Sequence, residues 1–174
     1  MTKKVKKEIK KVLVTGGAGY LGSHVVWYLL QQGVEVKVLD NLTYGNSGIK
    51  KILNNEKLEF VQGDICNIKD VVKAVKGCSA VIALAAIVGD PACSLNEEQT
   101  ITTNYESTKV LVEICKYYGI ERLLFASSCS VYGSNSGMVL NEGSFLRPVS
   151  LYAKTRVMSE DIILQSCGSV KPVI

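Results

Sequence analysis

Three glycines near the amino terminus constrain the fold of this chain more than any other feature of its sequence. Gly16, Gly19 and Gly22 recur at every third position. They follow the apolar, β-branched run 12–14, which predicts a buried strand, and they precede an apolar segment of helical length at 23–30. A strand, a glycine turn and a helix in this order predict a phosphate site. The turn lets an anion approach bare backbone, and the helix directs its unpaired N–H groups and positive dipole end at that anion.

A carboxylate further along the chain favours a dinucleotide as the ligand. The segment 34–39 predicts a second strand and is followed by Asp40, 21 residues after Gly19. An acid at this separation can accept hydrogen bonds from the hydroxyls of an adenosine ribose. It would repel a 2′-phosphate, and no arginine follows to neutralise one, so we expect NAD in preference to NADP. The alternative is an ordinary strand–helix–strand turn that binds no ligand.

Length and charge favour one domain that binds neither nucleic acid nor a membrane. The chain has 174 residues, of which 47% are hydrophobic and 21% charged, and this is enough for a substantial core. No apolar run is long enough to span a membrane. The net charge of +4 comes from positions 1–11, which hold six lysines and one glutamate. We therefore expect a basic leader at 1–10 and one domain at 11–174; a nucleic-acid or membrane role of the leader is the alternative.

The cysteines and the histidine predict no metal site. The six cysteines include no C-x-x-C pair, and the single histidine, His24, falls in the first turn of the helix after the glycines. Scattered thiols in an α/β chain are typical of a reducing compartment, so we expect a cytoplasmic protein. We expect His24 to pack beside the glycine turn.

Strand-like and helix-like segments alternate along the whole chain, which predicts an α/β fold of the Rossmann-like type: a doubly wound parallel sheet in three α/β/α layers. The expected strands are 12–14, 34–39, 58–62, 78–84, 121–126 and 170–174. The expected helices are 23–30, 68–76 with Asn67 as its N-cap, 97–118 ending at Gly119, and 151–167, with a further short helix near 49–53.

Small and polar residues follow three of the expected strands, at the edge where α/β sheets bind ligands. After the third strand, Asp64 can hydrogen-bond an adenine amino group and Ile65 can pack on its ring; a turn or cap role is the alternative for Asp64. The small residues at 85–91 would let a ligand lie against the backbone. Ser127 and Ser128 follow the fifth strand, where hydroxyl groups face the ligand crevice.

The motifs of this chain resemble the extended short-chain dehydrogenase/reductase family, which includes NAD-dependent nucleotide-sugar epimerases and dehydratases such as UDP-glucose 4-epimerase. The resemblance covers about residues 10–174. It depends on Thr-Gly-Gly-Ala-Gly-Tyr-Leu-Gly at 15–22, Asp-Asn-Leu at 40–42, Gly-Asp-Ile at 63–65, Leu-Ala-Ala at 84–86, Asn104 with Thr108, Ser-Ser-Cys-Ser-Val-Tyr-Gly at 127–133, and Tyr152 at the start of a helix.

The resemblance implies a general base and its helpers. Tyr152 would take the proton of a sugar hydroxyl while hydride passes to NAD, and Ser128 would hydrogen-bond the same hydroxyl. A tyrosine in water has a pKa near 10, so a base at neutral pH needs a shift of about three units, roughly 4 kcal/mol. A cation about 4 Å away can supply this, and Arg156 occupies the place of the family's cation. The residues expected to bind the cofactor are Gly16, Gly19, Tyr20, Leu21, Gly22, Asp40, Asn41, Leu42, Asp64, Ile65, Leu84, Ala85, Ala86, Asn104, Ser127, Tyr152 and Arg156.

Two features depart from the family pattern. The family has a lysine four residues after its tyrosine, whereas this chain has Arg156 there, and Lys154 faces elsewhere on the helix. Arginine keeps the charge but is bulkier and cannot release a proton, so we expect NAD binding to survive and turnover to fall. The chain also ends at the sixth expected strand, so the family's smaller C-terminal domain, which binds the nucleotide of a UDP- or GDP-linked sugar, is expected to be absent.

The sequence favours one enzyme class and leaves alternatives open. The family's dehydratases have an Asp-Glu pair where this chain has Cys129 and Ser130, which favours an epimerase or a simple oxidoreductase. The first alternative is a non-catalytic NAD-binding or dimerisation module, and the second is a redox-sensing regulator that binds nucleic acid through the leader. A homodimer is expected, because the long helix and the Tyr152 helix are the family's usual dimer faces.

Overall fold

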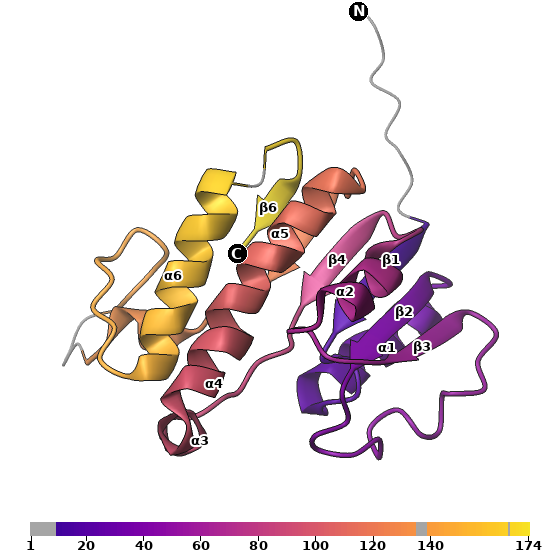
Figure 1. Cartoon of the computed structure of the whole chain (residues 1–174), viewed down its shortest axis with the longest axis horizontal. Coiled ribbons are helices and arrows are strands. Elements are labelled where there is room, and N and C mark those ends of the chain that lie inside the picture. Colours follow the sequence, from indigo (N-terminus) through magenta and orange to yellow (C-terminus); the bar gives the residue numbers. More distant parts are fainter. Residues whose placement is uncertain (1–9, 135–138, 167) are drawn as a thin grey trace, which may run out of the picture.

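The computed structural model describes residues 10–134, 139–166 and 168–174, so most of the expected leader, residues 135–138 of the loop and Cys167 lie outside the described part. A single parallel sheet has the strand order β3-β2-β1-β4-β5-β6 (Figure 1). The strands are β1 (Lys11–Thr15), β2 (Glu35–Asp40), β3 (Leu58–Gln62), β4 (Ala80–Ala83), β5 (Arg122–Phe125) and β6 (Lys171–Val173). The helices are α1 (Tyr20–Gln31), α2 (Ile68–Val75), α3 (Asp90–Leu95), α4 (Glu97–Ile101), the π-helical turn η1 (Thr102–Glu106), α5 (Ser107–Tyr117), the 3₁₀ turn η2 (Cys129–Tyr132) and α6 (Leu151–Ser166).

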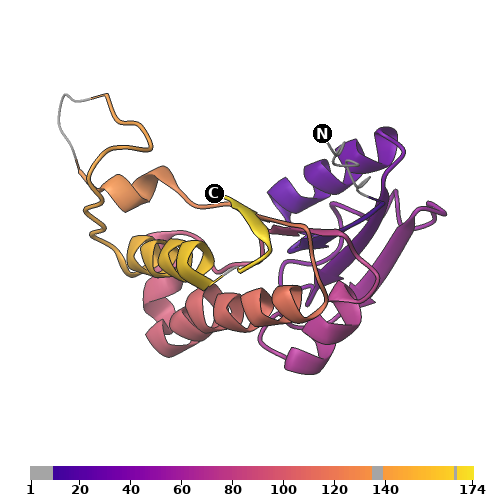
Figure 2. The same cartoon turned by 90° about the horizontal axis from the view of Figure 1, so that it is seen from above.

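Helices cover both faces of this sheet (Figure 2). Helix α1 packs on β1 and β2 on one face, whereas α2, α5 and α6 lie side by side on the other. The strand order reverses between β1 and β4, so the carboxyl ends of these two strands form the switch point at which open α/β sheets bind ligands. The predicted doubly wound, three-layer Rossmann-like fold is confirmed.

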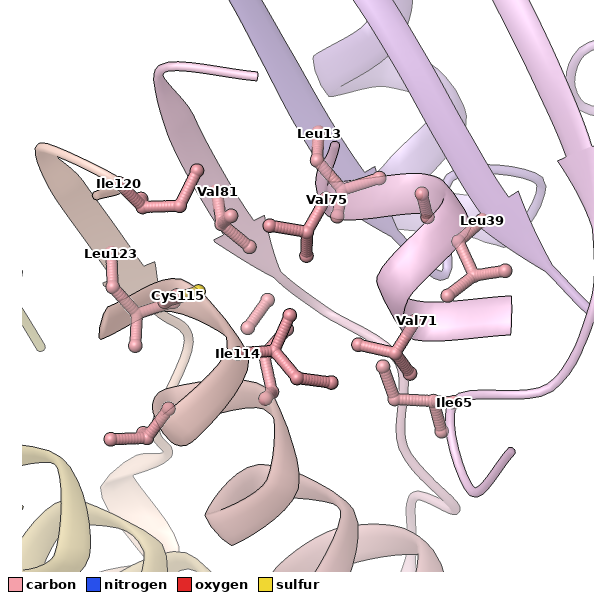
Figure 3. Packing of buried hydrophobic residues seen from close by; sticks show 14 of the residues in the cluster. Leu13, Leu39, Ile65, Val71, Val75, Val81, Ile114, Cys115, Ile120 and Leu123 are labelled. Carbon is pink, nitrogen blue, oxygen red and sulfur yellow. The ribbon is translucent and has the colours of Figure 1, made fainter. Parts of the chain in front are cut away.

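Alternate strand residues point to opposite faces of the sheet and form two hydrophobic cores. Leu13, Val81 and Leu123 belong to the larger core, beneath α2 and α5 (Figure 3). Val12 and Val14 belong to the smaller core, beneath α1. Because both faces are covered, the central strands β1, β4 and β5 are apolar on both sides and appear in the sequence as continuous apolar runs. Strands β2 and β3, nearer the edge, alternate apolar with charged or polar residues.

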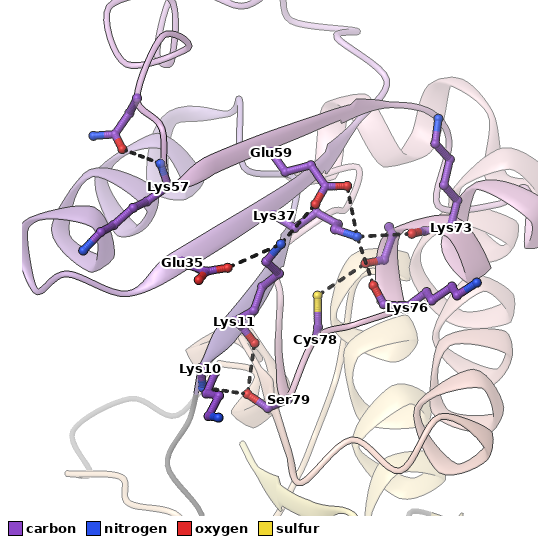
Figure 4. Close-up of polar contacts among 12 residues, drawn as sticks. Lys10, Lys11, Glu35, Lys37, Lys57, Glu59, Lys73, Lys76, Cys78 and Ser79 are labelled. Carbon is purple, nitrogen blue, oxygen red and sulfur yellow. Dashed lines mark hydrogen bonds and ion pairs between the residues drawn. The ribbon is translucent and has the colours of Figure 1, made fainter.

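The amino-terminal ends of the first three strands hold a cluster of opposite charges, which we call the amino-end cluster (Figure 4). Its members are Lys11, Glu35, Lys37 and Glu59. The Nζ atom of Lys37 lies 3.1 Å from Glu59 Oε1 and donates a hydrogen bond to the carbonyl oxygen of Lys76 at 3.0 Å. Lys37 is only 5% exposed. A buried cation is tolerated here because it meets both a carboxylate and the negative end of helix α2.

The predicted single helix over 97–118 is wrong in detail. Helix α4 is joined to α5 by the π-turn η1, in which the N–H group of Ser107 donates to the carbonyl oxygen of Thr102, five residues earlier. One extra residue in a helix hardly changes the apolar spacing of a window of this length, so the sequence pattern did not show it.

The predicted short helix near 49–53 is also wrong. This segment is a series of turns in which Ile49 accepts a hydrogen bond from the N–H group of Ile52 and Ile52 accepts one from Asn55. Helix α3 was not expected, and α1 begins at Tyr20 rather than at Ser23. The other predicted strands and helices are present. Strand β3 has the predicted bounds 58–62, and α6 begins at the predicted residue 151, while its predicted end at 167 lies outside the described residues. The remaining elements have shifted ends, and Asn67 is the N-cap of α2.

Candidate functional site

The glycine turn between β1 and α1 packs backbone directly against backbone. Gly16 has a φ of +70°, and a Cβ atom there would lie 2.8 Å from the amide nitrogen of Ala85. At Gly22, a Cβ atom would lie 2.1 Å from the carbonyl oxygen of Gly16. No side chain fits at either position without moving the main chain. These two glycines are therefore required by the packing of the turn itself.

Gly19 leaves the start of helix α1 accessible. A Cβ atom there would meet only the carbonyl oxygen of Gly16, at 3.3 Å. Gly19 is the N-cap of α1 and provides no side-chain cap, so the first N–H groups of the helix lack an intrahelical acceptor. Tyr20 is 87% and Leu21 is 55% exposed. Bare backbone, unpaired N–H groups and the positive end of a helix coincide here, and this fits the diphosphate of a dinucleotide.

Asp40, at the end of β2, is held beside this turn. Its Oδ2 atom accepts a hydrogen bond from the N–H group of Ala18 at 2.9 Å, and its Oδ1 atom accepts one from Leu42 at 2.8 Å. Each oxygen keeps a further lone pair for a ligand hydroxyl. Among the described residues, Leu42 is the only non-glycine residue with a positive φ, at +62°. Such strained backbone is concentrated at binding sites.

Asp64 and Ile65, the two residues expected to contact an adenine, lie in different surroundings. Asn41 donates from Nδ2 to Asp64 Oδ2 at 3.3 Å, so the structure brings both side chains to the ends of β2 and β3. Asp64 also accepts a hydrogen bond from the N–H group of Cys66 at 2.8 Å. Ile65, in contrast, is only 8% exposed and packs in the larger core (Figure 3).

The end of β4 lies directly beside the glycine turn. The hydroxyl oxygen of Thr15 accepts hydrogen bonds from the N–H groups of Leu84 and Ala85, each at 3.3 Å. Leu84, Ala85 and Ala86 are all partly exposed. The hydroxyl of Thr15 therefore joins the carboxyl ends of β1 and β4, and it keeps the small residues after β4 against the turn.

The expected cofactor residue Asn104 lies in the π-turn and is 1% exposed. Its Oδ1 atom accepts a hydrogen bond from the N–H group of Ile87, and its Nδ2 atom donates one to the carbonyl oxygen of the same residue, both at 2.8 Å. The side-chain amide of Asn104 thus binds the backbone of the loop that follows β4.

The serines after β5 have distinct partners. Ser128 is the N-cap of η2, and its hydroxyl oxygen accepts hydrogen bonds from the N–H group of Ser130 at 3.2 Å and from its hydroxyl at 2.9 Å. The proton of the Ser128 hydroxyl remains for donation to a ligand. Ser127 donates instead to the carboxylate of Glu160 on α6. Cys129, between the other residues of this motif, is exposed.

Tyr152 and Arg156 lie one turn apart on α6, beside the end of β5. The guanidinium carbon of Arg156 is 5.1 Å from the ring centre of Tyr152 and 5.2 Å from that of Phe125, within the range of a cation–π interaction. Arg156 is 3% exposed, and its Nε atom has no hydrogen-bond partner among the residues described by the structure. Burial lowers the pKa of Arg156, and the neighbouring Tyr152 and Cys93 oppose this shift.

Several residues at this site were not predicted. Glu160 follows Arg156 by four positions, so it lies on the same face of α6, and this spacing is the signal that could have identified it. Ala18 acts through its backbone and Thr15 through a short hydroxyl; both belong to the motif at 15–22, but the motif does not reveal which groups they contact. His24 lies in the second turn of α1, where it is exposed and its ring is tilted against the ring of Tyr20, with 5.0 Å between ring centres.

The described residues contain neither a metal-binding cluster nor a membrane-spanning helix. No group of three or more histidine, cysteine or acidic side chains in residues 10–134, 139–166 and 168–174 is arranged to hold a metal ion. Within the same ranges, no helix combines the length and the apolar character that crossing a bilayer requires.

The parallel sheet, the glycine turn at its switch point and the carboxylate at the end of β2 define a Rossmann-like domain of the dinucleotide-binding class. The model of the NAD dependent epimerase/dehydratase family matches residues 12–171, and the chain belongs to this family.

Its relatives differ in the reactions that their names describe. UDP-arabinose 4-epimerase 1 of Arabidopsis thaliana is 35% identical over 166 residues, which is 90% of this chain and 39% of that protein. The decarboxylating sterol-4-alpha-carboxylate 3-dehydrogenase of Mus musculus is 32% identical over 90% of this chain and 41% of its own length. UDP-glucuronic acid 4-epimerase of Bacillus cereus, solved with UDP-glucuronic acid and NAD, has a TM-score of 0.86 at 30% identity, covering 94% of this chain and 55% of that one. The chain thus spans about 40% of the length of these curated relatives.

Proposed function

We propose that this chain is the NAD-binding part of a nucleotide-sugar epimerase-type oxidoreductase, which transiently oxidises a sugar alcohol. The observation that supports this most is the position of the Arg156 guanidinium against the ring of Tyr152, 5.1 Å from its centre, on the helix beside the end of β5. NAD, when bound, would supply the hydride acceptor. Tyr152, Ser128 and Arg156 would then be the catalytic residues.

The proposed cofactor site lies along the carboxyl ends of β1, β2 and β4. The N–H groups after Gly19 would bind the diphosphate, and Asp40 would accept hydrogen bonds from the adenosine ribose hydroxyls. The carboxylate of Asp40 would also repel a 2′-phosphate, which is the reason to propose NAD and not NADP. Ala85 lies against Gly16, so a cofactor would meet small side chains and main chain there.

Each of the three catalytic side chains would act on one proton or charge. Tyr152 would take the hydroxyl proton of the substrate as the carbon–oxygen double bond forms, and it would return this proton when the bond is reduced. Ser128 has its hydroxyl proton free for a hydrogen bond to the substrate oxygen, because its own oxygen already accepts two hydrogen bonds. The charge of Arg156 would stabilise the ionised form of the phenol.

The proposed substrate is a UDP- or GDP-linked sugar. Two of the relatives named above are UDP-sugar epimerases by name, whereas a third acts on a sterol carboxylate. Cys129 and Ser130 stand where the family's dehydratases have an acid pair, which favours epimerisation or simple oxidation over loss of water. Because the chain spans about 40% of its curated relatives, its substrate site is proposed to need residues beyond this segment.

The test is reduction of bound NAD by a sugar. The protein that contains this segment together with the residues that complete its substrate site would be loaded with NAD and mixed with UDP- and GDP-sugars, while the near-ultraviolet absorbance of reduced nicotinamide is recorded. We expect Arg156→Lys to raise the rate of NADH formation over that of the reference chain, because lysine can approach the tyrosine hydroxyl as a compact charge. Lys154→Arg is the matched control, and an equal change in both variants would contradict the role of Arg156.

A second candidate is a non-catalytic NAD-binding module that descends from such an enzyme. The burial of Arg156 favours it, because a guanidinium held between two rings is less able to move during a reaction than an exposed ammonium group. NAD that binds tightly and is reduced by none of the sugars, in the reference chain and in Arg156→Lys alike, would support this second candidate.

We further propose a homodimer formed through α5 and α6. Tyr117 at the end of α5 is 84% exposed, and Leu164 and Met158 on α6 are 64% and 40% exposed. Light scattering of the purified chain should give twice the mass of one copy, and Leu164→Glu should give a single copy. A cytoplasmic location remains a prediction.

A further inference from the structure

Helices α4 and α5 form one continuous helix that is interrupted by the π-turn at Thr102–Glu106. A π-turn is less favourable than α-helix and occurs mostly as one turn at functional sites. Asn104 is at its centre and is 1% exposed. Because of the extra residue in the turn, the buried side chain and the carbonyl group of Asn104 are oriented differently from those of a regular α-helix.

Asn104 joins three segments that are distant in sequence. Its side-chain amide makes two hydrogen bonds of 2.8 Å to the N–H and carbonyl groups of Ile87, in the loop after β4. Its carbonyl oxygen accepts a hydrogen bond of 2.9 Å from the hydroxyl of Ser159 on α6. Ser159 is fully buried, and α6 lies beside α5 in the fold (Figure 1). The loop after β4, the π-turn and α6 are thus connected through one residue.

The two ends of this connection are parts of the proposed NAD site. Ile87 follows Ala86 directly, in the loop whose start lies against the glycine turn. Ser159 is seven residues after Tyr152 and three after Arg156, so all three lie on one face of α6. The connection therefore spans the distance between the loop after β4 and the helix that holds Tyr152.

We propose that Asn104 and Ser159 form a positioning pair, which fixes the loop after β4 relative to the Tyr152 face of α6. Asn104 then acts on the cofactor through Ile87 and α6, and its own amide does not contact the cofactor. This inference rests on the proposed NAD site. It predicts that loosening the pair disturbs the half of the cofactor near Tyr152, and leaves the half near Asp40 unchanged.

The variant Ser159→Ala tests the pair without unfolding the chain. It removes only the hydroxyl, and the Asn104 carbonyl oxygen keeps its hydrogen bond from the Thr108 hydroxyl at 3.1 Å, so no buried carbonyl is left without a partner. Ser107→Ala is the matched control. Ser107 is also buried beside the π-turn, but its hydroxyl donates to the carbonyl oxygen of Thr103 in the same helix, and so it joins no second segment.

The experiment compares the affinities for NAD and for ADP-ribose, which lacks the nicotinamide ring, by calorimetry. We expect Ser159→Ala to weaken NAD binding about fivefold, the loss of roughly one hydrogen bond, and to leave ADP-ribose binding unchanged. Ser107→Ala should change neither. If Ser159→Ala weakens both ligands equally, or neither, the positioning role is wrong, because a purely structural loss does not distinguish the two halves.

Amide hydrogen exchange separates this inference from the proposed function. If the reference chain binds neither ligand, the proposed NAD site fails, and exchange at the Ile87 amide still tests the connection. Faster exchange at Ile87 in Ser159→Ala than in Ser107→Ala would support a physical link from α6 to the loop. Equal exchange in the two variants would overturn it.

Discussion

The candidate site has two halves, one formed mainly by backbone and the other mainly by side chains. The half formed by β1 and β2 is built from main chain and one carboxylate, and Asp40 is fixed by hydrogen bonds from Ala18 and Leu42. The half formed by β5 and α6 depends on long side chains. Its central cation, Arg156, is buried with an Nε atom that has no partner in the described part of the chain.

Because of this difference, the two halves should differ in how well they tolerate amino-acid substitutions. A site made of backbone and glycine tolerates few substitutions, because the available space is set by main-chain atoms. A site made of side chains can exchange one cation for another and keep the fold. We infer that the packing of the fold constrains cofactor binding, whereas catalytic activity can change through substitution of single side chains.

The largest effect is expected from Gly22→Ala. The added Cβ atom would lie 2.1 Å from the Gly16 carbonyl oxygen, so α1 must move away from the turn. We expect the free energy of unfolding to fall by about 3 kcal/mol and NAD binding to disappear. Urea denaturation and calorimetry measure the two effects.

Gly45→Ala is the control for Gly22→Ala. No heavy atom lies within 4 Å of a Cβ atom at Gly45, although its φ is +78°. The free energy of unfolding should therefore fall only by the cost of placing alanine in the left-handed backbone conformation, roughly 1 kcal/mol. Equal losses of stability in the two variants would show that the turn has more space than the structure gives it.

The next largest effect is expected from Asp40→Asn. The amide removes the charge that is proposed to hold the ribose hydroxyls, so NAD affinity should fall about 10- to 100-fold, as for a hydrogen bond to a charged group. Preference for NAD over NADP should shrink as well, because the repulsion of a 2′-phosphate is gone. Asp161→Asn, an exposed acid on α6, is the control, and a similar loss of affinity in that variant would contradict the assignment of Asp40.

A smaller effect, on stability alone, is expected from Lys37→Met in the amino-end cluster. This change leaves the carbonyl oxygens of Lys73 and Lys76 without their buried donor, and the free energy of unfolding should fall by about 1–2 kcal/mol. NAD affinity should not change, because the cluster is at the opposite end of the strands. Lys57→Met removes an exposed lysine that also binds a carbonyl oxygen, and it should cost much less.

The smallest effect is the pH dependence of stability that comes from the protonation of Glu59. Burial raises its pKa, but hydrogen bonds and charges from Lys37 and Lys11 outweigh this and hold the pKa below its ordinary value. The unfolded chain therefore takes up the proton first as the pH falls. The contribution of Glu59 to the free energy of unfolding is complete above the ordinary glutamate pKa of about 4.3. It is lost as the pH falls from there through the lower pKa of the folded state.

Because the Glu59 side chain is 47% exposed, we expect this contribution to be less than about 1 kcal/mol. Urea denaturation at neutral and at acidic pH measures it. The reference chain should lose slightly more stability on acidification than Glu59→Gln does, and identical losses would contradict the ion pairs of the cluster.

The sequence predicted the features that depend on spacing and residue type. Alternating segments predicted the sheet and its layers, and the separation of Asp40 from Gly19 placed the acid near the turn. Spacing could not predict the π-turn, because one extra residue in a long helix leaves the apolar pattern almost intact. It also could not predict the partners of Asn104 and Glu160, because these lie on segments that only the folded chain brings together.

Calorimetric titration of the purified chain with NAD and with NADP tests the central claim most directly. If the glycine turn and Asp40 form a dinucleotide site that is complete within this segment, the titration will give one NAD per chain. Binding of NADP will be at least about tenfold weaker, since one lost charge-assisted hydrogen bond has about this effect. No binding of NAD, or equal binding of NADP, would contradict the claim.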